Sequence, residues 1–183
     1  SEAVTPMIKE KNRIATLKNN LNVDMDLSVP SGLTLSDFKT VLSNNLSDKN
    51  KIFEQSAEYF YKAEQKYKVN GIFLASIGIH ESAWGTSKIA NDKNNLFGFT
   101  AYDSDPYNSA TSFDNYENAI NKVAEVLSTK YLHVAGTKIS DELTATGTYF
   151  NGTSAKSVNV RYASDTGWAD KVFNYMQYLY NKL

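Results

Sequence analysis

The chain has 183 residues, and its 19 Lys and Arg against 20 Asp and Glu give a formal net charge of −1. This length predicts one domain with at most a small extension, large enough to bury a substantial core. The chain has no cysteine and only two histidines, so we expect neither disulfides nor a thiolate or multi-histidine metal site. The near-neutral charge argues against a nucleic-acid binder that works by phosphate neutralisation, and no apolar run is long enough to span a membrane. Residues 1–11 lack the apolar segment of a secretion signal, so we expect such a signal to be absent or already removed.

The first 67 residues show the apolar spacing of helices, interrupted by polar breaks. Polar residues that favour helix N-caps stand before two of these helices. The predicted elements are a helix over 7–22, an extended loop over 23–35, a short helix capped by Ser36, and a longer helix that Ser47 or Asp48 caps and that ends near Tyr67.

Residues 71–83 are different, because their side chains leave almost no polar face. A helix that is apolar on all sides lies buried in the core. A buried strand is the competing interpretation, and the length favours the helix. Asn70-Gly71 precedes this segment, and Trp84-Gly85 ends it.

The second half of the chain alternates polar loops with amphipathic helices. The predicted elements are a loop over 88–112, a helix from an Asp114–Glu117 capping box to about Tyr131, a short helix capped by Ser140, a loop or hairpin over 147–161, and a helix over 168–183 capped by Asp165 or Thr166. The whole pattern predicts a mainly α domain of six or seven helices, with long functional loops after Gly85 and Gly147.

Glu81 is the most unusual candidate for chemistry, because it arrives at the end of the helix predicted to be buried. Burial and the negative end of the helix dipole both disfavour a charged carboxylate, and Trp84 would add an apolar wall. These effects together predict a general acid. The alternative is a glutamate that emerges at the surface as its helix ends.

Two further clusters mix aromatic and polar residues. One is the loop over 94–103, which is typical of a sugar groove or of an ordinary loop pinned to the core by Leu96 and Phe97. The other is 161–168, where helix capping alone would explain much of the pattern. The aromatic content of 13%, with 12 Tyr, suits stacking on sugars, although an A/T-rich genome produces the same excess.

In their order and spacing, these clusters resemble a known family. Glu81-Ser82-Ala83-Trp84-Gly85, then Asn94-Asn95-Leu96-Phe97-Gly98 with Ala101-Tyr102-Asp103-Ser104, then Tyr162-Ala163-Ser164-Asp165 are similar to the glucosaminidase domain of bacterial autolysins and flagellar peptidoglycan hydrolases, glycoside hydrolase family 73. Ser164 stands where that family usually has Thr. The resemblance covers roughly 47–183 as a catalytic domain and leaves 1–46 as a helical N-terminal extension.

The resemblance implies a mainly α or α+β lysozyme-like fold with a substrate cleft and one small β-hairpin or long loop lobe. It implies hydrolysis of the β-1,4 bond between N-acetylglucosamine and N-acetylmuramic acid in peptidoglycan, without a metal or organic cofactor. It assigns Glu81 as the general acid and places Tyr162 at the same centre. The residues expected to line the groove are Asn95, Phe97, Tyr102 and Trp168.

The second catalytic carboxylate is expected between residues 100 and 114. Asp103, in the Ala-Tyr-Asp-Ser motif, is the first choice, and Asp105 and Asp114 are the other acids of this segment. Asp114 fits the role of a helix cap better. A third possibility is that the 2-acetamido group of the substrate assists, so inverting, retaining and substrate-assisted mechanisms remain open.

We expect the partner to be peptidoglycan glycan strands rather than nucleic acid or membrane. We also expect a secreted, cell wall-associated monomer within a larger multidomain protein. One alternative is the same fold acting as a muramidase or lytic transglycosylase. The other is a non-catalytic wall-binding module that kept the cleft.

Overall fold

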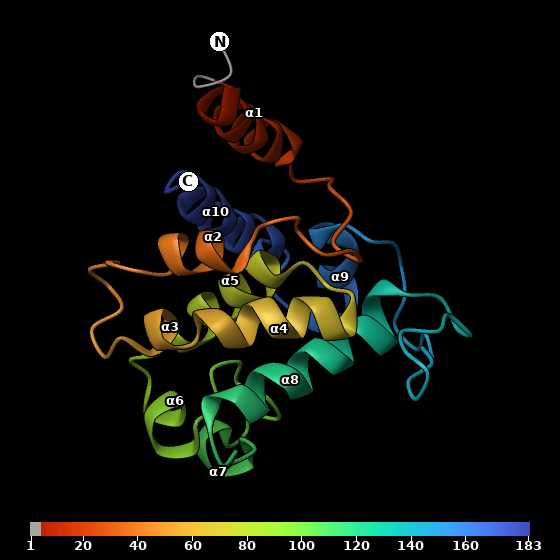
Figure 1. Cartoon of the computed structure of the whole chain (residues 1–183). Helices are drawn as coiled ribbons and strands as arrows, with labels where there is room; N and C mark the ends of the chain where they lie inside the picture. Colours follow the sequence, from red (N-terminus) through yellow and green to blue (C-terminus); the bar gives the residue numbers. More distant parts are fainter. Residues whose placement is uncertain (1–4) are drawn as a thin grey trace.

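The structure is a computed structural model that describes residues 5–183. Over these residues it has ten α-helices and one π-helix, and its only β pairing is the single bridge Lys138–Thr144 (Figure 1). The mainly α prediction is therefore confirmed, although six or seven helices are too few. The elements are α1 Thr5–Asn20, α2 Leu35–Val41, α3 Ile52–Gln55, α4 Ala57–Tyr67, α5 Gly71–Ser82, α6 Lys88–Lys93, α7 Pro106–Ser109, α8 Tyr116–Val126, the π-helix Leu127–Leu132, α9 Ala155–Tyr162 and α10 Trp168–Tyr180.

Helix α5 lies at the centre of the molecule, behind α4 in Figure 1. All its residues from Gly71 to Ile79 are buried, as expected for a helix that is apolar on all sides. Helices α4 and α10 pack directly against it, and α8 packs against α4. Only the last turn of α5 reaches the surface, where His80 is half-buried and Glu81 is exposed. The core therefore holds the helix rigidly and presents its C-terminal end.

Two polar side chains fix the start of α5. Asn70 accepts hydrogen bonds from two N–H groups of the first helical turn, both at 2.9 Å. The buried carboxylate of Glu64, on α4, accepts the N–H of Gly71 at 2.9 Å and the N–H of Ser31 at 2.7 Å. These contacts satisfy donors that a helix start leaves unpaired and set α5 in place against α4.

The predicted N-caps of α2 and α8 are wrong by two positions and by one position. Thr34, not Ser36, caps α2: its hydroxyl accepts the N–H of Asp37 at 3.1 Å, and the Asp37 carboxylate accepts the N–H of Thr34 at 2.8 Å. Asn115, not Asp114, caps α8 through the N–H of residue 118 at 2.8 Å. In both helices a neighbour with the same capping chemistry takes the position, so the pattern located the helix but not its first residue.

The helix predicted to run to Tyr67 is divided in the structure. The predicted N-cap is wrong, because Lys51 and not Ser47 or Asp48 holds that position. The Asp48 carboxylate still serves the first turn from a distance along the chain, because it accepts the N–H groups of Ile52 and Glu54 at 3.0 Å each. The chain then breaks at Ser56 into α3 and α4. Despite this break, the apolar residues predicted to face the core are buried in both helices.

The loop-rich second half holds more helix than predicted. Helices α6 and α7 lie within the predicted loop over 88–112, and α9 lies within the predicted loop or hairpin over 147–161. The helix expected after Ser140 is wrong, because Ser140 forms a tight turn with Leu143. Helix α9 has a weakly helical sequence, and the burial of Ala155 and its neighbours stabilises it instead.

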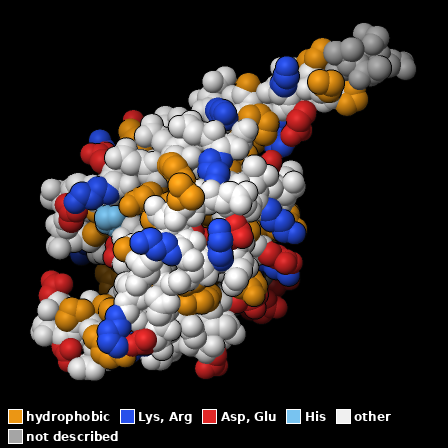
Figure 2. Space-filling view, turned by 90° about the vertical axis from the view of Figure 1, so that its left-hand side faces the viewer, with side chains coloured by type: hydrophobic (Ala, Val, Ile, Leu, Met, Phe, Trp, Pro, Cys, Tyr) orange, Lys and Arg blue, Asp and Glu red, His pale blue; other side chains and the backbone are white. Residues whose placement is uncertain are grey.

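Helix α1 stands apart from the other helices and projects beyond the body of the molecule (Figures 1 and 2). None of its residues is buried. Arg13 ties it to the domain by donating to a carboxylate oxygen of Asp37 at 2.7 Å. Apolar residues between 27 and 42 share the core of α4 and α5, and Leu17 of α1 is partly buried against that core. The division of the chain at residue 46 stays a prediction. No helix in the described range is long and apolar enough to cross a membrane.

Candidate active site

A cleft of about 730 Å³ opens where five segments meet. They are the last turn of α5, the loop 97–102, the end of the helical segment that α8 begins, the loop that carries Tyr149, and the connection from α9 to α10. Its ionisable side chains besides tyrosine are His80, Glu81, Lys130 and Asp165, and most of the others are aromatic or small. The predicted cleft is present, and its volume falls within the range of ligand-binding pockets. Acidic and basic side chains are interspersed on the face shown in Figure 2.

Glu81 projects from the last turn of α5 into this cleft. Its Oε1 accepts a hydrogen bond from the indole Nε1–H of Trp168 at 3.0 Å. Its Oε2 lies near Gly98, where an added Cβ would be 3.8 Å away. The prediction that Glu81 is buried is wrong: the residue is exposed, because the core ends one turn earlier and the cleft begins there.

The turn that follows α5 has a left-handed backbone. The three residues after Ser82 have φ values of +49°, +58° and +72°. This region costs a non-glycine residue about 1 kcal/mol or more. The Ser82 hydroxyl accepts the N–H of Gly85 at 2.8 Å, and Trp84 packs edge-on against Phe53 at 5.8 Å. Trp84 therefore anchors the turn away from the cleft, and the wall expected from it comes from Trp168 instead.

Four aromatic rings form one continuous wall of the cleft. In spatial order they are Tyr149, Tyr131, Tyr162 and Trp168, with successive ring centroids 5.2, 5.4 and 5.0 Å apart. Burial, and then the negative charge of Glu81, raise the pKa of Tyr162 above its usual value, so its hydroxyl stays protonated at neutral pH. The sequence analysis placed Tyr162 and Trp168 here but missed the other two tyrosines, for which the aromatic composition was the only indication.

The loop 97–102 forms another part of the cleft lining, and Asn95 holds its shape. The buried Asn95 side chain donates to the carbonyl oxygens of Phe99 and Thr111, both at 3.0 Å, and accepts the N–H groups of Phe97 and Phe99 at 3.1 and 3.0 Å. Phe97 and Tyr102 belong to the cleft lining, where the sequence analysis expects them. Asn95 lies beneath the lining and supports it.

The carboxylates proposed as the second catalytic group lie outside the cleft lining. Asp103, Asp105 and Asp114 are all exposed, and among the described residues only Glu81 and Asp165 bring carboxylates to the lining. The prediction that Asp165 or Thr166 caps α10 is wrong, because Gly167 holds the N-cap position. Asp165 was not predicted at the cleft, although it belongs to the third motif.

Asp165 is tied to the protein rather than free in the cleft. Its Oδ2 accepts a hydrogen bond from Lys171 Nζ at 2.6 Å, and its Oδ1 accepts the N–H of Gly167 at 2.9 Å. These two donors, Lys171 above all, hold the pKa of Asp165 below its usual value. At neutral pH this side chain is therefore a fixed negative charge at the cleft edge. Within residues 5–183 no group of three or more His, Cys, Asp or Glu residues could hold a metal ion.

A family model described as mannosyl-glycoprotein endo-beta-N-acetylglucosaminidase matches residues 57–181, more than half of the chain. The chain belongs to the glucosaminidase family. This confirms the resemblance inferred from the three motifs and identifies a glycoside hydrolase domain of the endo-β-N-acetylglucosaminidase type.

Curated relatives of this glucosaminidase domain are bacterial. A putative endo-β-N-acetylglucosaminidase of Streptococcus pneumoniae serotype 4 is 34% identical over 158 residues, which is 86% of this chain and 22% of that protein. A β-N-acetylglucosaminidase of Bacillus subtilis is 28% identical over 172 residues, covering 87% of this chain and 18% of that protein. The glucosaminidase domain thus spans about a fifth of the length of these relatives.

Solved structures of similar fold come from Staphylococcus aureus. Autolysin E in complex with the muropeptide NAM-L-Ala-D-iGlu has a TM-score of 0.58 and 25% identity, covering 93% of this chain and 77% of that one. A catalytic mutant of autolysin E in complex with the disaccharide NAG-NAM has a TM-score of 0.60 and 24% identity, over 93% and 78% of the two chains. The glucosaminidase domain therefore has the fold of autolysin E.

Proposed function

We propose that this glucosaminidase domain hydrolyses the β-1,4 bond between N-acetylglucosamine and N-acetylmuramic acid in peptidoglycan, with Glu81 as the general acid. The position of Glu81 carries the proposal: its carboxylate stands in a cleft of about 730 Å³, accepts the indole N–H of Trp168 and lies beside the aromatic wall. The complexes of autolysin E with NAG-NAM and with a muropeptide support this class of substrate.

In the proposed reaction, Glu81 protonates the leaving glycosidic oxygen. The indole N–H of Trp168 engages Oε1, so the carboxyl group has a fixed orientation and Oε2 remains available to the substrate. Tyr162 contributes a neutral hydroxyl that donates a hydrogen bond at the same centre. The tyrosines of the aromatic wall stack against the apolar faces of sugar rings. No step of this scheme requires a cofactor.

The second catalytic group has two candidate side chains in this chain. Asp103 keeps the role assigned from its motif, and it follows directly on Tyr102, which belongs to the cleft lining. Asp165 lines the cleft itself, but Lys171 and Gly167 already engage both of its carboxylate oxygens. A tied carboxylate suits electrostatic stabilisation of the developing positive charge better than proton transfer. We therefore propose Asp103 as the group that positions water and Asp165 as the alternative that stabilises charge.

The decisive variant is Glu81→Gln, which keeps the size of the side chain and an acceptor for Trp168. We expect turnover of purified peptidoglycan to fall by about 10²–10⁴-fold, the usual contribution of a general acid, while the unfolding midpoint stays unchanged. Glu142→Gln, at an exposed glutamate outside the cleft lining, is the matched control. Residual activity above roughly a tenth of the wild-type rate would contradict the assignment, given that contribution. A wild-type domain no faster than Glu81→Gln would indicate a wall-binding module.

The products identify the bond. We expect new reducing ends on N-acetylglucosamine, measured by reduction and mass spectrometry of the digest. Reducing N-acetylmuramic acid would indicate a muramidase, and anhydro ends would indicate a lytic transglycosylase.

The variants Asp103→Asn and Asp165→Asn, assayed side by side on the same digest, locate the second group. If only Asp103→Asn loses hydrolytic activity, Asp103 is supported as the second group. If only Asp165→Asn loses it, the role moves to Asp165. If both variants keep the wild-type rate, Asp105, Asp114 and the acetamido group of the substrate remain as candidates.

We also propose that the domain acts outside the cell, on the wall, as part of a longer protein. The autolysins of similar fold and the length of the curated relatives support this. The near-neutral charge of this chain gives it little attraction to an anionic wall, so we propose that other domains of the longer protein supply the targeting.

A further inference from the structure

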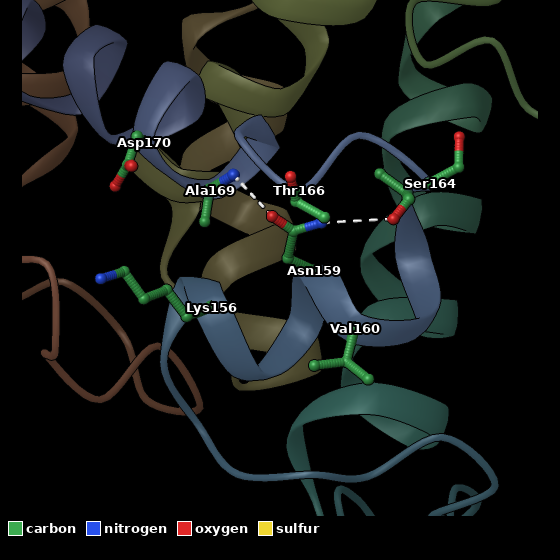
Figure 3. A pocket seen from close by; sticks show the side chains of 8 residues that line it. Lys156, Asn159, Val160, Ser164, Thr166, Ala169 and Asp170 are labelled. Atoms are coloured by element: carbon green, nitrogen blue, oxygen red, sulfur yellow. Dashed lines mark hydrogen bonds between the residues drawn. The ribbon is translucent and has the colours of Figure 1, made fainter.

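Beyond the cleft, α9 and the start of α10 enclose a second hollow of about 360 Å³ (Figure 3). Ala163 and Ser164 line both the hollow and the cleft, so the connection between the helices borders both spaces. The proposed cleavage reaction uses neither the hollow nor the side chains at its rim. Its volume lies at the lower end of the range for small-ligand pockets.

The walls of the hollow are fixed before any ligand binds. Asn159 is buried between the helices, where Nδ2 donates to the carbonyl oxygen of Asp165 at 2.9 Å and to that of Ala163 at 3.3 Å. Its Oδ1 accepts the N–H of Ala169, in the first turn of α10, at 2.9 Å. Figure 3 shows this side chain reaching from α9 toward α10. A ligand would therefore meet a preformed surface and would not have to order it.

The hollow combines an apolar surface with two unpaired charges. Val160 is 61% exposed and belongs to the lining of the hollow. Lys156 and Asp170 are exposed at the rim, and neither takes part in an ion pair within residues 5–183. An uncharged glycan has no groups that match these charges. A short peptide with small apolar side chains, a carboxylate and an ammonium group matches all of them.

We propose that this hollow binds the peptide that branches from N-acetylmuramic acid in the substrate. The proposal rests on the proposed function, because the peptide reaches the hollow from a sugar bound in the cleft, across Ala163 and Ser164. Lys156 pairs with a carboxylate of the peptide, Val160 contacts its alanine methyl group, and Asp170 pairs with the ammonium group of a longer peptide. The hollow thereby favours glycan strands that carry peptides over bare strands.

The first test is binding of two probes to the full chain, labelled with ¹⁵N and followed by NMR. N-acetylmuramoyl-L-alanyl-D-isoglutamate carries two free carboxylates, and N-acetylmuramic acid alone is the matched control probe. We expect the peptide-bearing probe to shift the backbone amides that belong to the hollow and not to the cleft, over 156–160 and 169–170, and the sugar alone to leave them in place. If N-acetylmuramic acid alone or a neutral N-acetylglucosamine oligomer shifts these amides equally, the proposal is overturned.

Charge variants test the assigned contacts. Lys156→Glu should weaken binding of the peptide-bearing probe by about fivefold or more. A surface ion pair contributes up to about fivefold in affinity, and the reversed charge adds repulsion. Lys122→Glu makes the same change on α8, outside the lining of both spaces, and should have no effect. Asp170→Asn should weaken only a probe extended by lysine. Equal effects of the two lysine variants would refute the proposal.

This test is separate from the test of the proposed function. If the chain cleaves glycan strands and the peptide leaves the backbone amides of the hollow unshifted, only the inference drawn from the hollow is refuted. A chain that binds the peptide there but cleaves no glycan supports the hollow as a peptide site and refutes the proposed cleavage reaction.

Discussion

Glu64→Ala would remove a buried acceptor that joins separate parts of the chain. In the wild type, Glu64 Oε1 accepts the N–H groups of Ser31 and Gly71 at 2.7 and 2.9 Å, and the residue has no exposed surface. Alanine leaves both donors without their acceptor in a closed region. One donor belongs to the loop before α2 and the other starts α5, so the substitution loosens that loop and the start of the central helix, which then keeps only the Asn70 contacts.

The cost follows from the groups left behind. Each orphaned donor costs about 1–3 kcal/mol, and the one lost methylene costs about 0.8 kcal/mol, so we expect Glu64→Ala to lose about 3–7 kcal/mol of unfolding free energy. That is a large share of the roughly 5–15 kcal/mol that holds an ordinary domain folded. Glu64→Gln keeps the volume and the accepting oxygen, and it removes a buried charge, so it should lie within about 1 kcal/mol of the wild type.

The pH dependence of the unfolding free energy also distinguishes Glu64→Gln from the wild type. Burial raises the pKa of Glu64 above its ordinary value of 4.5, so the folded state keeps the proton to higher pH than the unfolded state does. The stability that Glu64 contributes is complete below the unfolded pKa and falls as pH rises through the folded pKa. Gln has no such proton. The difference in unfolding free energy should therefore move in favour of Glu64→Gln between mildly acidic and neutral pH.

Urea unfolding of the three proteins at both pH values measures these effects. Glu58→Ala, on the same helix, is the control, because Glu58 is exposed and only pairs with Lys62 at 2.9 Å. Its unfolding midpoint should match the wild type. If Glu64→Gln loses as much stability as Glu64→Ala, the accepted hydrogen bonds are not the source of the stability. If the difference in unfolding free energy between Glu64→Gln and the wild type does not change with pH, the buried-charge argument is refuted.

Three more substitutions have defined outcomes. Trp168→Phe removes the hydrogen-bond donor to Glu81 but keeps an aromatic ring. We expect kcat to fall about tenfold or more with KM nearly unchanged, which is the usual contribution of a hydrogen bond to a charged group. An unchanged kcat would show that Glu81 needs no such donor. Tyr162→Phe should lower kcat without moving the unfolding midpoint, and a lower midpoint would indicate a structural role. Gly147→Ala should lower the midpoint while activity per folded molecule persists, because φ is +61° and the new Cβ would lie 2.5 Å from the backbone nitrogen of Ala135.

Sequence patterns predicted the long or fully apolar helices and missed the short ones. Helix α5 could be predicted because a helix that is buried on all sides appears in the sequence as an almost uninterrupted run of apolar residues. Helices such as α6, α7 and α9 are too short to be stable by propensity, and contacts from distant parts of the chain stabilise them. Those contacts do not show in a local window of sequence.

The site divides along the same line. The ordered motifs located Glu81, Tyr162 and Trp168, all of which line the cleft. The expectation about Trp84 failed because three residues further along would face the same side only if the helix continued. The helix ends at Ser82, and the left-handed turn carries Trp84 away from the cleft. The burial of Glu81 was mispredicted because periodicity indicates which way a side chain points but not where the core stops.

Trp168 couples the core to the chemistry. Its ring is 1% exposed and packs edge-on against Phe73 of α5 at 6.1 Å, while its indole N–H reaches Glu81 at the far end of the same helix. The packing of α10 against α5 therefore delivers the donor to the carboxylate, without a separate loop to position it. Asn159 adds a second constraint, because it holds the first turn of α10 against α9. The acid can thus be exposed and still be oriented, since its one fixed partner is part of the hydrophobic core.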